Sequence, residues 1–165
     1  MADVHLAYIG LGSNLEDPLA QIQQALAALG RLPLTRRVAA SPCYASRPVG
    51  PQDQPDFINA VAALETRLSP LALLDQLQAL EQRQRRKRLR HWGPRTLDLD
   101  LLLHDDTCLA SPRLTLPHPH MASRGFVLLP LANIAPTLCL PDGRRIADLA
   151  ARHAGDGLRA LLPQR

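Results

Sequence analysis

The sequence predicts an α+β fold of the ferredoxin-like type, in which helices pack on an antiparallel sheet. The main observation is the order of strand-like and helix-like patterns, which is β-α-β-β-α-β followed by a C-terminal extension. The chain has 165 residues, which fits one domain over residues 1–165. It is 46% hydrophobic and 21% charged, a balance typical of a soluble globular protein.

The first half of the chain supplies three strands and a helix. Residues 5–11 predict the opening strand, which we expect to end at Gly12-Ser13-Asn14. A helix then begins at Asp17-Pro18, an N-cap followed by proline at the first helical position. It ends near Gly30. Residues 36–44 and 57–66 predict two further strands, and the prolines and glycine between them predict a loop over 46–55.

The second half supplies the remaining helices and one strand. A helix begins at Ser69-Pro70 and has an apolar face of leucines at helical spacing: Leu73, Leu74, Leu77 and Leu80. Residues 97–103 predict the fourth strand of the core. The extension is expected to contain an irregular segment over 112–119, a helix over 126–134, a turn at Asp142-Gly143 and a short helix over 146–153. The tail over 154–165 has no pattern that indicates a function.

The basic residues are concentrated in one segment. Residues 83–95 hold six arginines and Lys87 without any acidic residue. The net charge of the chain is +4, so the rest of it sums to −3 once the +7 of this segment is removed. A local patch on an acidic body suits a single polyphosphate, whereas proteins that coat nucleic acid spread their cations over a whole face. Repulsion among the like charges predicts a mobile loop.

A pair of carboxylates follows the basic segment directly. Asp98 and Asp100 stand two apart in the predicted strand, so they share one face while Leu97, Leu99 and Leu101 face the core. Such a pair is tolerated when a divalent cation lies between the carboxylates, and magnesium would take its other ligands from water and phosphate. The alternative is an exposed strand with two solvated aspartates. The adjacent cations favour a nucleotide-triphosphate site.

Other patterns exclude common classes. Lys87 is the only lysine and follows Arg86, so there is no Walker A loop, and Leu15 occupies the third glycine position of a dinucleotide fingerprint. No apolar run reaches the length of a membrane span, and the N-terminus does not resemble a signal peptide. The cysteines are three and far apart, which predicts no disulfide framework and favours a reducing cytoplasm.

Two phenylalanines are candidates for binding a flat heterocycle. Phe57 opens a strand after the proline-rich loop, and Phe126 opens a helix, so their rings could stack on either side of a ligand. Asn59 shares a strand face with Phe57 and could bind the ligand's edge. The alternative is two core phenylalanines and a structural asparagine. His118 and His120 lie in a proline-bound loop, which leaves metal binding, phosphate binding and simple loop polarity open.

Four blocks of the sequence, in their order and spacing, resemble the 6-hydroxymethyl-7,8-dihydropterin pyrophosphokinase family. They are Gly12-Ser13-Asn14, the run from Gly50 to Asn59, the run Trp92-Gly93-Pro94-Arg95-Thr96-Leu97-Asp98-Leu99-Asp100, and the run from Arg113 through His118 to Phe126. The resemblance covers roughly residues 5–145. It implies a monomeric, cytoplasmic enzyme of folate biosynthesis that moves the pyrophosphoryl group of ATP to the hydroxymethyl oxygen of the pterin.

The resemblance also implies a role for particular residues. Two Mg²⁺ ions would lie between the phosphates and Asp98 and Asp100, with Arg95 and the loop arginines Arg86 and Arg88 completing the catalytic set. The residues implied to bind the pterin are Ser46, Val49, Phe57, Asn59, Trp92 and Phe126. The residues implied to bind ATP are Gln78, Glu81, Trp92, Arg95, Leu101, Arg113, Thr115, His118 and Arg124.

This chain departs from the family pattern at a few positions. Phe57 stands where tyrosine is common, and Pro119 stands where an aromatic residue often follows the histidine. The basic loop is one residue shorter, so the two loop arginines are either Arg86 and Arg88 or Arg85 and its neighbour. Two other hypotheses stay open on the sequence. One is a ferredoxin-like RNA-binding module, which the absence of aromatics from the strand over 97–103 disfavours. The other is an inactive relative that binds ATP without turnover.

Overall fold

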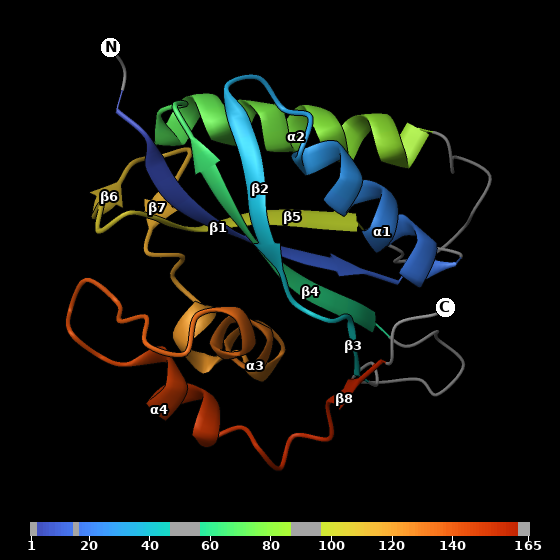
Figure 1. Cartoon of the computed structure of the whole chain (residues 1–165), viewed down its shortest axis with the longest axis vertical. Coiled ribbons are helices and arrows are strands. Elements are labelled where there is room, and N and C mark those ends of the chain that lie inside the picture. The colour runs from blue at the N-terminus through green and yellow to red at the C-terminus, as the bar shows by residue number, and fades with distance from the viewer. Residues whose placement is uncertain (1–2, 15–16, 47–56, 87–96, 162–165) are drawn as a thin grey trace.

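The computed structural model describes residues 3–14, 17–46, 57–86 and 97–161, with the side chains of residues 85 and 86 outside that description. Its main sheet is built around β1 (His5–Ser13), β4 (Phe57–Thr66) and β5 (Leu97–His104) (Figure 1). β1 lies between β5 and β4 and pairs antiparallel with both. The other edge of β4 pairs with β2 (Thr35–Ala40) and β3 (Tyr44–Ser46). This strand order is the ferredoxin-like order that the sequence predicts.

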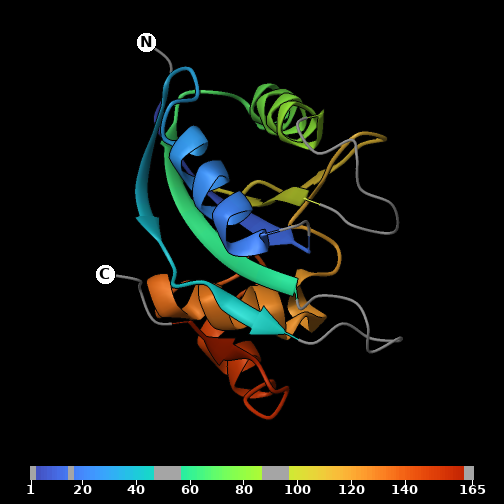
Figure 2. The same cartoon turned by 90° about the vertical axis from the view of Figure 1, so that its right-hand side faces the viewer.

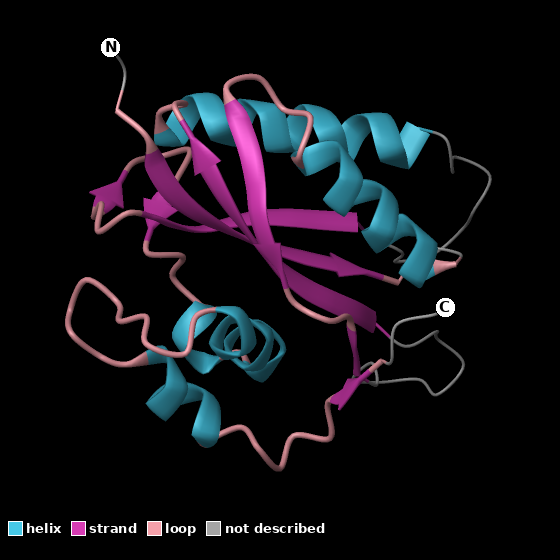
Figure 3. Ribbon diagram, in the orientation of Figure 1, coloured by secondary structure: helices cyan, strands magenta, loops and turns pink. Residues whose placement is uncertain are grey.

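The helices cover both faces of this sheet (Figures 2 and 3). α1 (Pro18–Leu29) and α2 (Pro70–Arg86) bury their leucines against one face, as expected for the two crossover helices. α3 (Gly125–Ile134) and α4 (Ile146–Ala151) come from the C-terminal extension and pack on the other face. A hairpin of β6 (Leu109–Ala110) and β7 (Thr115–Leu116), then a turn of 3₁₀ helix η1 (Met121–Ser123), connects β5 to α3. β7 places a short strand in the segment expected to be irregular.

The strand expected over 36–44 is two strands, with a break at Ser41-Pro42-Cys43. Ser41 ends the first strand by hydrogen bonding twice to Val61: its backbone N–H donates to the Val61 carbonyl (2.8 Å), and its hydroxyl accepts from the Val61 N–H (3.0 Å). Pro42 follows and has no N–H to continue the ladder. β3 then resumes the pairing with β4 from Tyr44 onward.

Three further boundaries differ from the expectation. β1 continues through Gly12 and Ser13, because both residues pair with β4 on one side and β5 on the other. Asp17 stands at the N-cap position of α1, but its backbone is left-handed (φ 54°) and its side chain makes no capping hydrogen bond. α2 extends through Arg86, so the first part of the basic segment is helix rather than loop.

The C-terminal tail contains a strand that the sequence does not indicate. β8 (Arg159–Ala160) pairs with β3 and becomes the outer strand of the sheet. The Leu161 N–H also donates to the Cys43 carbonyl (2.7 Å). The tail is therefore part of the packed molecule as far as Leu161. Among the described residues, no helix has the length and apolar character needed to cross a membrane.

Candidate active site

A cavity of about 730 Å³ opens at one end of the sheet, on the face that carries α3. The central strands β1 and β4 supply its floor through Gly10, Gly12 and Asn59. β5 contributes Asp98 and Asp100 to one wall. Ser46 of β3 and Phe57 of β4 also line it, together with the N-terminus of α3 and the C-terminal tail. The cavity therefore brings together side chains from distant parts of the chain.

Strand alternation explains why these residues meet. Along β5, Leu97, Leu99 and Leu101 are buried in the core beneath α1 and α2, which leaves Asp98 and Asp100 on the opposite face. β1 runs between β4 and β5, and its Gly12 pairs with Asn59 of β4 on one side and with Asp98 of β5 on the other. Asn59, Gly12 and Asp98 thus lie in one row across the three strands. The sequence prediction that the two carboxylates share a face is confirmed.

The floor of the cavity depends on a glycine with little room for a side chain. A Cβ atom at Gly12 would lie 3.0 Å from Oδ1 of Asn59. Asn59 is 5% exposed, and its Nδ2 donates to the hydroxyl of Ser46 (3.3 Å). Gly12 and Ser46 therefore fix the position of the Asn59 amide. Gly10 and Gly12 are missed by the sequence reasoning, although two glycines two apart in a strand indicate a bare patch on one face.

The carboxylates are set in a partly desolvated position. Burial raises the pKa of Asp100 above its ordinary value. Asp98 raises the pKa of Asp100 further, while His118 and Arg124 oppose the rise. Two neighbouring carboxylates whose charges destabilise one another fit the donor set of a hard divalent cation such as Mg²⁺, which takes oxygen ligands and tolerates one or two carboxylates. The residues present at this wall thus fit the metal that the resemblance implies.

A histidine and an arginine lie close enough to Asp100 to affect its charge. Burial lowers the pKa of His118, Asp100 counteracts this, and Arg124 and His120 lower it further. Nδ1 of His118 accepts the backbone N–H of His120 (3.2 Å), so the neutral ring carries its hydrogen on Nε2. A neutral ring with an Nε2–H is a hydrogen-bond donor for a phosphate oxygen. The binding of phosphate, one of the alternatives left open by the sequence, is compatible with this geometry.

Both phenylalanines line the cavity rather than fill a core. Phe57 is half-buried at the start of β4, and Phe126 is 37% exposed at the start of α3. The guanidinium of Arg124 lies over the Phe126 ring, 5.6 Å from its centroid. An exposed ring in a cavity is available to stack on a ligand. Two core phenylalanines, the alternative interpretation, do not describe this arrangement.

Several of the residues implied to bind ATP lie apart from this cavity. Arg113 contacts Asp75 and Gln78 of α2, with its Nη2 2.5 Å from Asp75 Oδ1 and 3.2 Å from Gln78 Oε1. The Glu81 carboxylate accepts the backbone N–H of Leu99 (2.7 Å). These contacts join α2 to β5 and to the β6–β7 hairpin beside the carboxylate wall.

Of the other residues that the resemblance implies, some lie among the described residues and some do not. Thr115 is exposed on β7, and the side chain of Leu101 is buried in the core beneath α1 and α2. Arg86 ends α2, but its side chain lies outside the described part of the chain. Val49, Arg88, Trp92 and Arg95 also fall outside the described residues, so their assignments stay predictions.

The C-terminal tail contributes two lining residues that no sequence pattern indicates. Asp156 and Leu158 stand on the cavity wall just before β8. His153 Nδ1 lies 2.6 Å from Asp156 Oδ2, and a Cβ at Gly125 would come within 2.6 Å of the same oxygen. The absence of a side chain at Gly125 thus lets the tail approach the N-terminus of α3. The position of these residues depends on tertiary packing alone.

Comparison with known proteins gives a consistent result. The family model described as 7,8-dihydro-6-hydroxymethylpterin-pyrophosphokinase (HPPK) matches residues 8–136. The 2-amino-4-hydroxy-6-hydroxymethyldihydropteridine pyrophosphokinase of Pseudomonas aeruginosa is 56% identical over 158 residues, which cover 96% of this chain and 98% of that protein. The protein of the same name from Haemophilus influenzae is 50% identical over 157 residues, which cover 95% of this chain and 98% of that protein.

A solved structure shows the same fold at low sequence identity. The crystal structure of wild-type Plasmodium falciparum HPPK-DHPS with pteroate matches with a TM-score of 0.70 and 14% identity. The match covers 92% of this chain but 42% of that chain, so this chain spans less than half of the longer protein. At this identity the likeness supports the fold alone. It agrees with the strand order observed here.

Proposed function

Because the chain belongs to the 7,8-dihydro-6-hydroxymethylpterin-pyrophosphokinase (HPPK) family, we propose that it transfers the pyrophosphoryl group of ATP to a pterin. The acceptor is the hydroxymethyl oxygen of 6-hydroxymethyl-7,8-dihydropterin, and the products are AMP and the pterin diphosphate, an intermediate of folate biosynthesis. The observation that carries this proposal is a single cavity with an aromatic and amide part beside a pair of carboxylates.

The pterin occupies the part of the cavity between Phe57 and Phe126. Their rings stack on the two faces of the heterocycle, and the amide of Asn59 binds its edge. The hydrogen bond between Asn59 and Ser46 and the close approach of Gly12 support this role, because they hold the amide in one orientation before the ligand binds. Val49 and Trp92 belong to the proposed pterin site by resemblance.

Asp98 and Asp100 hold Mg²⁺, and we propose two ions. Bound Mg²⁺ neutralises phosphate charge and orients the reacting groups. The protein holds the binding side chains in position. The backbone pairing of β1 with β5 fixes both carboxylates, and α3 directs Phe126 toward the same cavity. We propose that the pterin hydroxyl is activated by Asp98 or by the metal that Asp98 would hold.

The triphosphate lies along the carboxylate wall toward α2. His118 and Arg124 donate to phosphate oxygens next to Asp100, and Arg113, Gln78, Glu81, Thr115 and the backbone at Leu101 bind the nucleotide farther along. Support for this placement comes from His118 and Arg124, whose positive charge lowers the pKa of Asp100, and from the contact of Arg113 with Gln78. Arg86, Arg88, Arg95 and Trp92 complete the site by resemblance. Donors arranged before the reaction stabilise charge that develops on the transferred group.

The reaction is tested by incubating the protein with ATP, Mg²⁺ and 6-hydroxymethyl-7,8-dihydropterin and following products by phosphorus NMR. We expect AMP and a pterin diphosphate, formed only when Mg²⁺ is present. Asp98→Ala is expected to reduce turnover by about 10³-fold or more, since charge stabilisation of this kind contributes several kcal/mol. Formation of ADP, or full activity of Asp98→Ala, would contradict the proposal.

A matched control comes from Asp142, an exposed carboxylate paired with Arg144 in a surface turn. Asp142→Ala removes the same chemical group away from the cavity and is expected to retain turnover. We also propose that the enzyme acts as a monomer in the cytoplasm. Size-exclusion chromatography with light scattering over a range of protein concentrations tests the first point, and fractionation of the native cells tests the second.

A further inference from the structure

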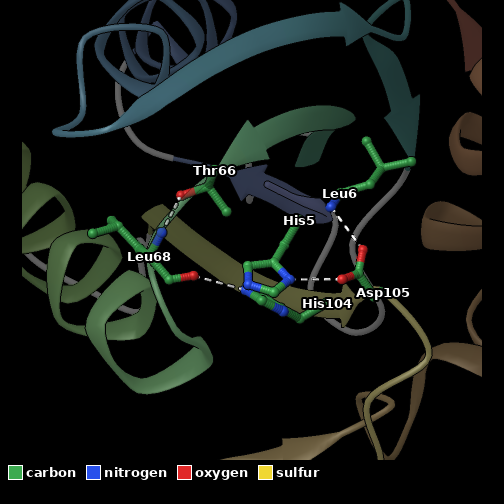
Figure 4. Close-up of polar contacts among 6 residues, drawn as sticks. All are labelled: His5, Leu6, Thr66, Leu68, His104 and Asp105. Atoms are coloured by element: carbon green, nitrogen blue, oxygen red, sulfur yellow. Dashed lines mark hydrogen bonds and ion pairs between the residues drawn. The ribbon is translucent and has the colours of Figure 1, made fainter. Parts of the chain in front are cut away.

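Figure 4 shows a second cluster of polar side chains, which includes His5, His104 and Asp105. It lies at the opposite end of β1 and β5 from the cavity. His104 of β5 pairs with Ala7 of β1, whereas Asp98 pairs with Gly12, five residues farther along the strand. Five residues of strand correspond to about 17 Å. One ligand atom from each of His5, His104 and Asp105 lies within 4.8 Å of the other two. This cluster is therefore separate from the Asp98 and Asp100 pair.

One nitrogen of His104 is buried and lacks a hydrogen bond. His104 is 2% exposed, and its Nε2 lies 2.9 Å from the carbonyl oxygen of Leu68. Because a carbonyl oxygen only accepts, Nε2 carries the hydrogen of the neutral ring, and Nδ1 has a lone pair. Nδ1 has no hydrogen-bond partner among the described residues. A buried acceptor without a partner is destabilising, so Nδ1 of His104 is a candidate ligand atom.

The other two side chains are already held beside it. Nδ1 of His5 lies 2.7 Å from Oδ2 of Asp105, and the His5 and His104 ring centroids are 4.7 Å apart. Oδ1 of Asp105 accepts the backbone N–H of Leu6 (2.8 Å). The Leu68 carbonyl is positioned in turn by the Leu68 N–H, which donates to Thr66 (3.1 Å). The side chains of His5 and Asp105 are 30% and 44% exposed, which opens the cluster to solvent.

We propose that His5, His104 and Asp105 form a binding site for a divalent cation of the Zn²⁺ class, with water as the fourth ligand. Two imidazole nitrogens and one carboxylate oxygen are a donor set that suits Zn²⁺, whereas Mg²⁺ prefers oxygen alone. A metal-bound histidine commonly donates its other ring N–H to a carbonyl, as His104 does to Leu68. When the cation binds Nδ1 of His5, the hydrogen on that atom moves to Nε2 of the same ring.

Such a cation links the start of β1 to the end of β5. His5 opens β1, His104 closes β5, and Asp105 follows it directly. A cation that binds only the folded chain stabilises it in proportion to the logarithm of its concentration over its Kd. The site therefore stabilises the ends of β1 and β5 that lie farthest from the cavity. This inference does not rest on the proposed function.

The site is tested by calorimetric titration of the untagged, chelator-treated full chain with ZnCl₂ in a large excess of Mg²⁺. Excess Mg²⁺ competes with Zn²⁺ at carboxylate sites such as Asp98 and Asp100, whereas it competes poorly at a site with two imidazole ligands. We expect one equivalent of Zn²⁺ to bind and to raise the midpoint of thermal unfolding. Substitution of Co²⁺ for Zn²⁺ is expected to give the visible absorption of a four-coordinate cobalt site.

His5→Gln and Asp105→Asn are each expected to weaken Zn²⁺ binding by at least about tenfold, since changes even outside the ligand set cost about 10- to 100-fold. Both residues are partly exposed, and asparagine tolerates the left-handed backbone of Asp105 (φ 50°), so neither variant should unfold the chain. Circular dichroism without metal checks this point. Both variants should also lose the cobalt spectrum and the zinc-dependent rise in the unfolding midpoint.

The matched control is His153→Gln. His153 and Asp156 form the same kind of exposed pair, with Nδ1 2.6 Å from the carboxylate, and stand outside the cluster of three ligands. This variant should bind Zn²⁺ as the unmodified chain does. The proposal is wrong if no zinc binds in excess Mg²⁺, if binding survives both His5→Gln and Asp105→Asn, or if His153→Gln abolishes it.

Discussion

The two faces of the sheet serve different purposes. The face beneath α1 and α2 carries a continuous apolar core, with Ile9, Leu64 and Leu99 among its buried residues and Leu77 of α2 packed on it. The other face is apolar only at one end, where α3 and α4 cover Tyr8, Val61 and Leu102. At its other end the same strands present glycines, an amide and two carboxylates to the cavity. A strand that is buried on both faces can thus support a core on one side and a binding site on the other.

The comparison shows how this site avoids weakening the fold. β1, β4 and β5 hold site residues on one face, and their alternate residues pack in the core on the other. Because the sheet holds the backbone of the site residues in place, their side chains lose little conformational freedom when the substrate binds. We call the face beneath α1 and α2 the closed face and the face that carries the cavity the open face. Substitutions on the closed face should mainly reduce the stability of the fold, and substitutions on the open face should mainly reduce ligand binding.

The largest expected effect on stability comes from the closed face. Leu77 is fully buried between α2 and the sheet, so Leu77→Ala leaves a cavity and should reduce the free energy of unfolding by about 2–5 kcal/mol. Phe126→Ala on the open face removes a ring that is 37% exposed, and should weaken pterin binding by about tenfold or more with a smaller loss of stability. For each variant, urea unfolding measures the free energy of unfolding and calorimetric titration measures the affinity for the pterin. Equal destabilisation by the two changes would contradict the division between the faces.

A smaller effect is expected at the floor of the cavity. Gly12→Ala places a Cβ 3.0 Å from Asn59 Oδ1, which must shift the amide, and should raise the Kd for the pterin about tenfold. Gly10→Ala is the matched control, because its Cβ would meet only the side chain of Leu102 at 3.4 Å, an ordinary contact. Titration of both variants with the pterin tests this difference. Equal affinity of the two variants would show that Gly12 does not position Asn59.

Much of this arrangement could be predicted from the sequence because local patterns determine it. The strand over 57–66 agrees with β4 at both ends, since a proline-rich loop and a proline after the next turn bound its apolar run. The common face of Asp98 and Asp100 followed from the period of two in a strand. The family resemblance is confirmed by the comparisons. The burial of Leu73, Leu74, Leu77 and Leu80 followed from helical spacing.

The features that could not be predicted depend on tertiary contacts. β8 is two residues long and exists because β3 offers it an edge. Asp156 and Leu158 reach the cavity because Gly125 leaves room for the tail. The break at Ser41 depends on its hydrogen bonds to Val61, a residue twenty positions away. Periodic patterns in the sequence do not indicate such contacts between residues that are far apart in the chain.

The smallest expected effect on pterin binding concerns the C-terminal tail, which lines the cavity but belongs to none of the four helices that cover the sheet. Truncation after Asp156 removes Leu158, β8 and the hydrogen bond from Leu161 to Cys43. The cavity then loses one wall, and the Kd for the pterin should rise by a few-fold, since about 1 kcal/mol of apolar contact is lost. Truncation after Leu161 is the matched control and should leave the affinity unchanged.

Cys43 reports independently whether the tail has left the sheet. Burial raises the pKa of its thiol, so at a given pH a smaller fraction is the reactive thiolate than for an ordinary cysteine. Removing the tail exposes Cys43, lowers its pKa toward the ordinary value and should speed alkylation at pH 8. Cys108 and Cys139 are exposed, so they are replaced by serine in both truncations before rates are compared. Faster alkylation with unchanged pterin affinity would show that the tail covers the sheet edge but does not form the cavity wall.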